Sequence, residues 1–141
     1  MPGKSTEKFL IDTNVFIAAV KRGWTDTTEL LLHLLSSSRY RLIANDVLLA
    51  EYRKYAERLD AMDFYEFLVS RVDLVNPKPE DVRKVLSYFP KSQVADAVHA
   101  ATCLITGAVL ITNDRHFEEI SKAGLIEVWS VTTAIKRLIR R

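Results

Sequence analysis

The chain has a single cysteine, no long apolar run and almost no net charge. One cysteine, Cys103, excludes an internal disulfide, and its apolar neighbours predict a buried, unreactive thiol. The apolar stretches are far shorter than the roughly 20 residues that cross a bilayer, so no transmembrane helix is expected. A net charge of +2 does not mark a strongly basic nucleic-acid-binding surface.

The rest of the composition is typical of one ordered domain. The 141 residues are 48% hydrophobic and 27% charged, enough for one core and too few for two domains. Residues 1–8 are polar and lack the apolar segment of a signal peptide, which predicts a cytoplasmic protein. We therefore expect one domain over residues 1–141, with a polar N-terminal tail at residues 1–7.

Segments with strand and helix patterns alternate along the chain. Strands are predicted at residues 9–11, 40–43, 72–75, 109–111 and 127–129. Helices are predicted at residues 13–20, 25–35, 61–71, 79–87, 94–105, 117–122 and 131–140, with a further helix that Asn45 or Asp46 caps. This alternation predicts an α/β fold with a central, mostly parallel sheet and helices on both faces.

Four carboxylates stand out because of their apolar surroundings. Asp12 and Asp114 each follow an apolar run that reads as a buried strand, and ligands bind at the carboxyl ends of strands in open α/β sheets. Glu51 and Asp96 lie in apolar stretches of predicted helices. Carboxylates are rarely buried unless they are paired or bind a metal, although Asp96 could instead cap its helix. The sequence therefore predicts an acidic pocket.

The expected metal follows from the donor atoms. Carboxylate oxygens suit Mg²⁺ or Mn²⁺, and no cluster of cysteine or histidine favours zinc. One or two such ions commonly serve phosphoryl chemistry, in which they activate water and stabilise the leaving oxygen.

Four segments, in this order, make a pattern that is more specific than any one of them. They are Ile11-Asp12-Thr13-Asn14 after a strand, Ala50-Glu51-Tyr52 on a helix, Asp96-Ala97-Val98-His99-Ala100-Ala101, and Thr112-Asn113-Asp114-Arg115-His116-Phe117 after another strand. In these segments the chain resembles the PIN-domain ribonucleases, which include single-domain archaeal and bacterial proteins and VapC-like toxins.

The resemblance implies a metal-dependent ribonuclease, often the toxin of a toxin–antitoxin pair. It implies that Asp12, Glu51, Asp96 and Asp114 form the catalytic, metal-binding quartet. Thr13, Asn14 and Thr112 would orient those carboxylates. The partners that it implies are an RNA substrate, an antitoxin protein and a second copy of the chain.

One position departs from the family pattern. Many relatives carry an acid two residues after the last aspartate, and this chain has His116 there. The site would then hold one metal ion, or a second ion only when substrate is bound. Arg115 and His116 would contact an RNA phosphate or lie in a solvated loop. His99, three residues after Asp96, is expected to be a scaffold residue.

Two other functions remain open from the sequence. The first is a non-catalytic PIN-fold module that binds RNA or serves as a scaffold, which His116 favours and the intact quartet disfavours. The second is another magnesium-dependent phosphatase, with Asp12 as nucleophile. Enzymes of that kind, resembling haloacid dehalogenases, usually carry a second aspartate two residues later, where this chain has Asn14.

Overall fold

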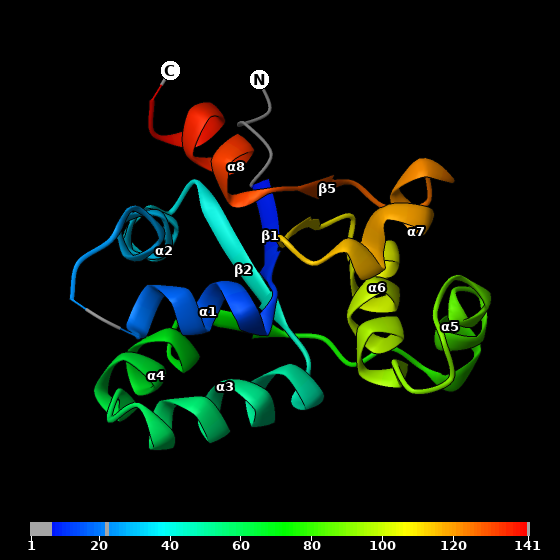
Figure 1. Ribbon diagram of the computed structural model, residues 1–141, viewed down its shortest axis with the longest axis horizontal. Helices are drawn as coiled ribbons and strands as arrows, with labels where there is room; N and C mark the ends of the chain where they lie inside the picture. The colour runs from blue at the N-terminus through cyan, green and yellow to red at the C-terminus, as the bar shows by residue number, and fades with distance from the viewer. Residues whose placement is uncertain (1–6, 22, 141) are drawn as a thin grey trace.

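The computed structural model describes residues 7–21 and 23–140, and a parallel sheet forms its centre (Figure 1). The described strands are β1 (Glu7–Ile11), β2 (Tyr40–Ala44), β3 (Val72–Leu74), β4 (Val109–Ile111) and β5 (Val128–Trp129). They lie in the order β3-β2-β1-β4-β5, and every pairing is parallel. The strand order reverses between β1 and β4, so a ligand-binding crevice is expected at the carboxyl ends of these two strands.

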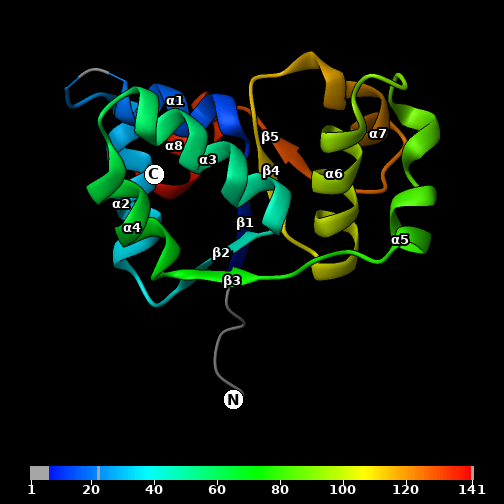
Figure 2. The same cartoon turned by 90° about the horizontal axis from the view of Figure 1, so that it is seen from below.

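Helices cover both faces of the sheet (Figure 2). The described helices are α1 (Thr13–Val20), α2 (Asp26–Ser36), α3 (Asp46–Arg58), α4 (Met62–Val69), α5 (Pro79–Arg83), α6 (Val94–Thr106), α7 (Glu118–Lys122) and α8 (Val131–Leu138). Two short 3₁₀ helices, η1 (Leu86–Tyr88) and η2 (Arg115–Phe117), join them. Helices α1 to α4 and α8 lie on one side, and α5 to α7 lie on the other. The predicted α/β architecture is confirmed.

Side-chain caps explain where the helices near the strand ends begin. The Asp12 carboxylate accepts a hydrogen bond from the Thr13 amide at the start of α1. The Asn45 side chain caps α3 by accepting from the Leu48 amide at 2.7 Å, as one of the two predicted caps. Gly107, with φ of +76°, ends α6 in the left-handed conformation that glycine adopts without strain.

One local prediction was wrong, and one alternative left open by the sequence is excluded. The helix predicted at residues 79–87 ends at Arg83, and a 3₁₀ turn replaces its second half. Pro90 favours an extended Phe89, so the chain leaves the helical conformation before that point. Asp96 does not cap α6: the cap position is Gln93, and Asp96 lies within the first turn.

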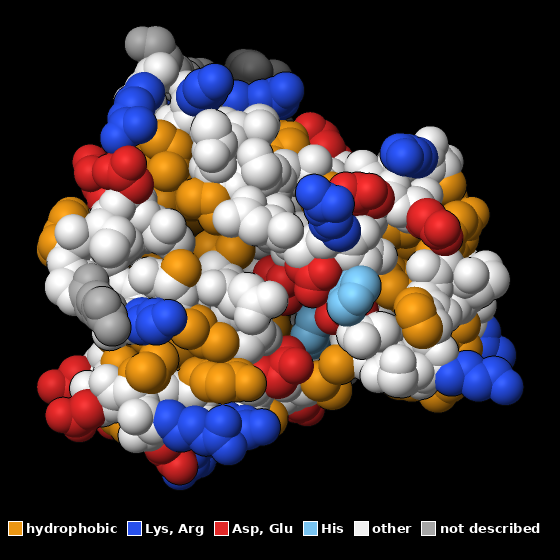
Figure 3. All heavy atoms as spheres, in the orientation of Figure 1, with side chains coloured by type: hydrophobic (Ala, Val, Ile, Leu, Met, Phe, Trp, Pro, Cys, Tyr) orange, Lys and Arg blue, Asp and Glu red, His pale blue; other side chains and the backbone are white. Residues whose placement is uncertain are grey.

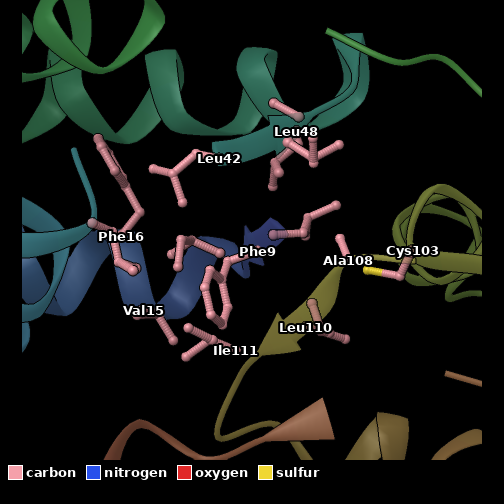
Figure 4. Close-up of a cluster of buried hydrophobic side chains, with 14 of the residues drawn as sticks. Phe9, Val15, Phe16, Leu42, Leu48, Cys103, Ala108, Leu110 and Ile111 are labelled. Atoms are coloured by element: carbon pink, nitrogen blue, oxygen red, sulfur yellow. The ribbon is translucent and has the colours of Figure 1, made fainter. Parts of the chain in front are cut away.

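Strand β1 lies at the centre of the core, between side chains from both layers (Figure 4). Phe9, Leu10 and Ile11 are each at most 1% exposed. The rings of Phe16 on α1 and Tyr52 on α3 stack at 4.6 Å between centroids, which fixes these helices against each other. Cys103 is buried as predicted, and burial raises the pKa of its thiol.

Of the tail predicted at residues 1–7, residues 1–6 lie outside the described part of the chain, and Glu7 begins β1. Among the described residues, none of the helices has the length and apolar character needed to span a bilayer.

Candidate metal centre

Asp12 follows the carboxyl end of β1, which pairs with β4 in the sheet. It is 5% exposed, and both of its carboxylate oxygens accept hydrogen bonds. Oδ1 accepts from the Thr13 amide at 2.9 Å, and Oδ2 accepts from the Thr112 hydroxyl at 2.6 Å. Burial raises the pKa of Asp12, and the hydrogen bond from Thr112 offsets part of that effect. The structure therefore holds this carboxylate in one orientation, in a place that disfavours its charge.

Thr112 connects Asp12 with the second strand-end carboxylate. Its hydroxyl donates to Asp12 and accepts from the amide of Asp114 at 2.9 Å. Since one hydroxyl makes both bonds, the side chain of Asp12 and the backbone of Asp114 are placed relative to each other. Thr112 is 3% exposed, so water competes little for these bonds.

Glu51 approaches Asp12 from α3, and Thr13 lies between them. Its Oε1 accepts from the Thr13 hydroxyl at 2.8 Å and faces Nε2 of His99 at 2.8 Å. Burial by itself raises the pKa of Glu51, but the hydrogen bonds from His99 and Thr13 outweigh it and leave the pKa lowered. Glu51 is thus held as a carboxylate, and both bonds end on the same oxygen.

A buried hydrogen-bond network determines how His99 faces Glu51. Asn45 uses its Oδ1 to cap α3, so its amide nitrogen faces outward as a donor. That nitrogen lies 3.1 Å from Nδ1 of His99 and donates to the Thr102 hydroxyl at 2.9 Å. Nδ1 of His99 is therefore an acceptor, and the hydrogen on Nε2 is donated to Glu51. The network joins α3 to α6 across the edge of the site.

Asp96, Asp114 and His116 form the open side of the site. One ligand atom from each lies within 4.8 Å of the others. Nδ1 of His116 lies 3.2 Å from Oδ2 of Asp96 and 3.3 Å from Oδ1 of Asp114. Burial raises the pKa of Asp96, and the charges of Asp12 and Asp114 raise it further. Carboxylates that destabilise one another in this way fit a bound cation.

On the surface, acidic and histidine side chains gather in a hollow between the α1–α3 part and the α6–α7 part of the molecule (Figure 3). Next to the hollow, a cavity of about 370 Å³ is lined by Asp114, Arg115 and Lys122, among others. The site therefore combines an acidic centre with a neighbouring cavity that carries cationic side chains.

The structure brings together most of the residues that the sequence singled out. Asp12, Asp96 and Asp114 lie close enough for their charges to interact, and Glu51 is joined to Asp12 through Thr13. Thr112 holds Asp12, and the ligand atoms that cluster most closely belong to Asp96, Asp114 and His116. Asn14 is exposed on α1, and within the described residues no hydrogen bond joins it to these carboxylates. Arg115 is exposed beside Asp114.

Sequence reasoning missed the hydrogen-bonding role of Asn45 beyond its cap, and that of Thr102. Asn45 was identified only as one of two possible caps for α3. Its complete burial against His99 and Thr102 is visible only when α3 and α6 are placed together. For Thr102, the only signal in the sequence is that a polar residue interrupts the apolar stretch at residues 100–105.

Comparisons with known proteins agree with this fold. The family model described as PIN domain matches residues 9–123. No curated protein matches the sequence.

Solved structures resemble the chain over nearly its whole length. VapBC-1 from nontypeable Haemophilus influenzae matches with a TM-score of 0.64 and 22% identity, over 89% of this chain and 98% of that one. VapBC2 from Rickettsia felis, bound to a DNA fragment from its promoter, matches with a TM-score of 0.61 and 15% identity, over 87% and 98%. PAE2754 from Pyrobaculum aerophilum matches with a TM-score of 0.63 and 15% identity, over 97% of this chain and 100% of that one. At these identities the likeness shows a shared fold.

Proposed function

Because the chain belongs to the PIN domain family, a family of nucleases, we propose that it is a metal-dependent endoribonuclease. The observation that supports the proposal is that Asp12, Asp96 and Asp114, from three separate segments, lie close enough for their charges to interact. Glu51, from a fourth segment, is joined to Asp12 through Thr13. Hydrogen bonds and neighbouring charges connect all four. The family match gives no support to a phosphatase with Asp12 as nucleophile.

The four carboxylates have different roles in this proposal. Asp12, together with Asp96 or Asp114, would hold one Mg²⁺ or Mn²⁺, whose hard character suits carboxylate oxygens. Such an ion lowers the pKa of a bound water and neutralises charge on a phosphodiester. Glu51, held as a carboxylate by His99 and Thr13, would orient the attacking water through the oxygen that those two residues leave available.

The substrate is RNA in this proposal. Arg115 and Lys122 line the cavity beside Asp114, where they would hold phosphates of the strand by charge. Binding should therefore weaken as the salt concentration rises.

We also propose that the protein is the toxin of a toxin–antitoxin pair. The likeness to two VapBC structures supports an antitoxin partner. The partner would cover the acidic hollow, and a basic side chain is the group best suited to enter it. A homodimer, which light scattering of the purified chain would detect, belongs to the same proposal.

The test is cleavage of a mixed RNA pool by the purified chain with Mg²⁺ or Mn²⁺, next to an EDTA control. The variant Asp12→Asn removes the charge at the most buried member of the quartet. We expect it to lower the cleavage rate by more than about 100-fold, since loss of residues that only orient metal ligands already costs about 10- to 100-fold.

Thermal unfolding of the same variant provides the control for its fold. A folded Asp12→Asn that cleaves at the normal rate would contradict the assignment. A folded wild type that binds metal and cleaves no RNA would favour the non-catalytic scaffold.

A further inference from the structure

His116 lies where an oxygen ligand would be expected, and its ring points back at two carboxylates. Its backbone amide donates to Oδ1 of Asp114 at 2.9 Å, which forms the first turn of η2. This short turn brings Nδ1 of the same residue between Asp96 and Asp114. The side chain of His116 is 45% exposed, so its position next to the acids is not forced by burial.

We propose that Nδ1 of His116 is a direct ligand of the metal ion that Asp96 and Asp114 hold, and that this nitrogen makes the site favour first-row transition ions over Mg²⁺. The inference rests on the proposed metal-dependent function and specifies the chemistry of its metal.

The three ligand atoms lie close enough together for one ion to bind all of them. Neighbouring ligands of an octahedral ion lie about 3.0 Å apart when the metal–ligand bonds are about 2.1 Å long. The distances from Nδ1 to Asp96 and to Asp114 are 3.2 and 3.3 Å, nearly equal to each other. The 3.2 Å contact with Asp96 also lies within hydrogen-bonding range, so the same nitrogen can donate to this carboxylate when no ion is bound.

The chemical consequence follows from the softness of the donor. Mg²⁺ prefers oxygen ligands and keeps its waters, whereas imidazole suits ions such as Co²⁺, Fe²⁺, Ni²⁺ and Zn²⁺. Neutral imidazole with its hydrogen on Nε2 presents the Nδ1 lone pair to the ion. Replacing an acid by His116 also removes one negative charge from the site, which weakens the attraction for Mg²⁺ most, since Mg²⁺ binds through charge.

Pulsed electron paramagnetic resonance of the Mn²⁺-loaded full chain detects a metal-bound nitrogen directly, without any variant. We expect ¹⁴N coupling in the wild type, its loss in His116→Ala, and its persistence in the matched control His33→Gln, which changes an imidazole on α2. Calorimetric titration then compares Co²⁺ with Mg²⁺. His116→Ala should lose at least about tenfold in Co²⁺ affinity and less than about threefold in Mg²⁺ affinity, and His116→Asp should bind Mg²⁺ more tightly than the wild type.

Bound Mn²⁺ without nitrogen coupling in the wild type would overturn the inference, and so would coupling that persists in His116→Ala. Neither readout depends on RNA cleavage. A wild type that cleaves RNA but lacks the coupling overturns this inference alone. A wild type with the coupling that cleaves no RNA overturns the ribonuclease and leaves the ligand assignment in place.

Discussion

The two sides of the metal centre are built differently. On the closed side, Asp12 and Glu51 accept hydrogen bonds from Thr13, Thr112 and His99, and a buried network continues behind them. On the open side, Asp96 and Asp114 are partly exposed, and both contact the half-exposed His116. The closed side fixes positions before any ligand arrives, whereas the open side can adjust to one. Removing a hydrogen-bonding side chain on the closed side should therefore destabilise the fold. Removing a carboxylate charge on the open side should stabilise the metal-free protein.

The largest effect is expected at the back of the closed side. Asn45→Ala removes the cap of α3 and leaves buried polar atoms of His99 and Thr102 without their donor. A lost cap costs about 0.5–2 kcal/mol, and each unsatisfied buried group about 1–3 kcal/mol. We expect roughly 3 kcal/mol less stability, measured by urea unfolding.

The matched variant Asn45→Ser keeps a capping oxygen but is too short to reach His99. It should lose about half as much stability as Asn45→Ala. Equal losses in both variants would show that the cap is irrelevant, and no loss in either would contradict the network.

The next effect tests the residue that joins the two sides. Thr112→Val keeps the shape of the side chain but removes the hydroxyl that donates to Asp12 and accepts from the Asp114 amide. Loss of such orienting groups should lower the rate of metal-dependent RNA cleavage by about 10- to 100-fold. Thr112→Ser restores the hydroxyl and should recover most of the rate. If serine fails to rescue the rate, the effect is one of packing.

The smallest effect has the opposite sign and lies on the open side. Burial and the charges of Asp12 and Asp114 raise the pKa of Asp96, so its ionised form opposes folding. Asp96→Asn should stabilise the metal-free protein at neutral pH by about 1 kcal/mol, which shifts Tm by roughly 3 °C.

The stabilisation expected in Asp96→Asn should depend on pH. The unfolded carboxyl ionises near its ordinary value of 3.8, and the folded one only at higher pH. Stability is therefore lost as the pH rises through this window, and the full penalty is present at neutral pH. The advantage of Asp96→Asn should shrink as the pH is lowered toward 3.8, in scans with EDTA. Glu66→Gln, at an exposed position on α4, is the control for removal of a carboxylate outside the site.

The sequence predicted those parts of the site that depend on one strand end at a time. Asp12 and Asp114 follow apolar strands, and parallel pairing brings those strand ends together without further information. The contact of His99 with Glu51 could not be predicted, because it depends on how α3 and α6 are rotated toward each other. The closeness of His116 to Asp96 depends on a single 3₁₀ turn, whose conformation no periodic pattern reveals.

The peptide group between Ile11 and Asp12 is held from two sides. Its carbonyl accepts a hydrogen bond from the Tyr52 hydroxyl, and its amide donates to the carbonyl of Ile111 at 3.1 Å. The Asp12 amide can therefore exchange its hydrogen for deuterium only when β1 and β4 separate, which breaks the centre of the sheet. Its exchange rate should report unfolding of the whole domain, although the residue belongs to the proposed metal centre. On the time scale of this exchange, the backbone that positions the Asp12 carboxylate is lost only when the domain unfolds.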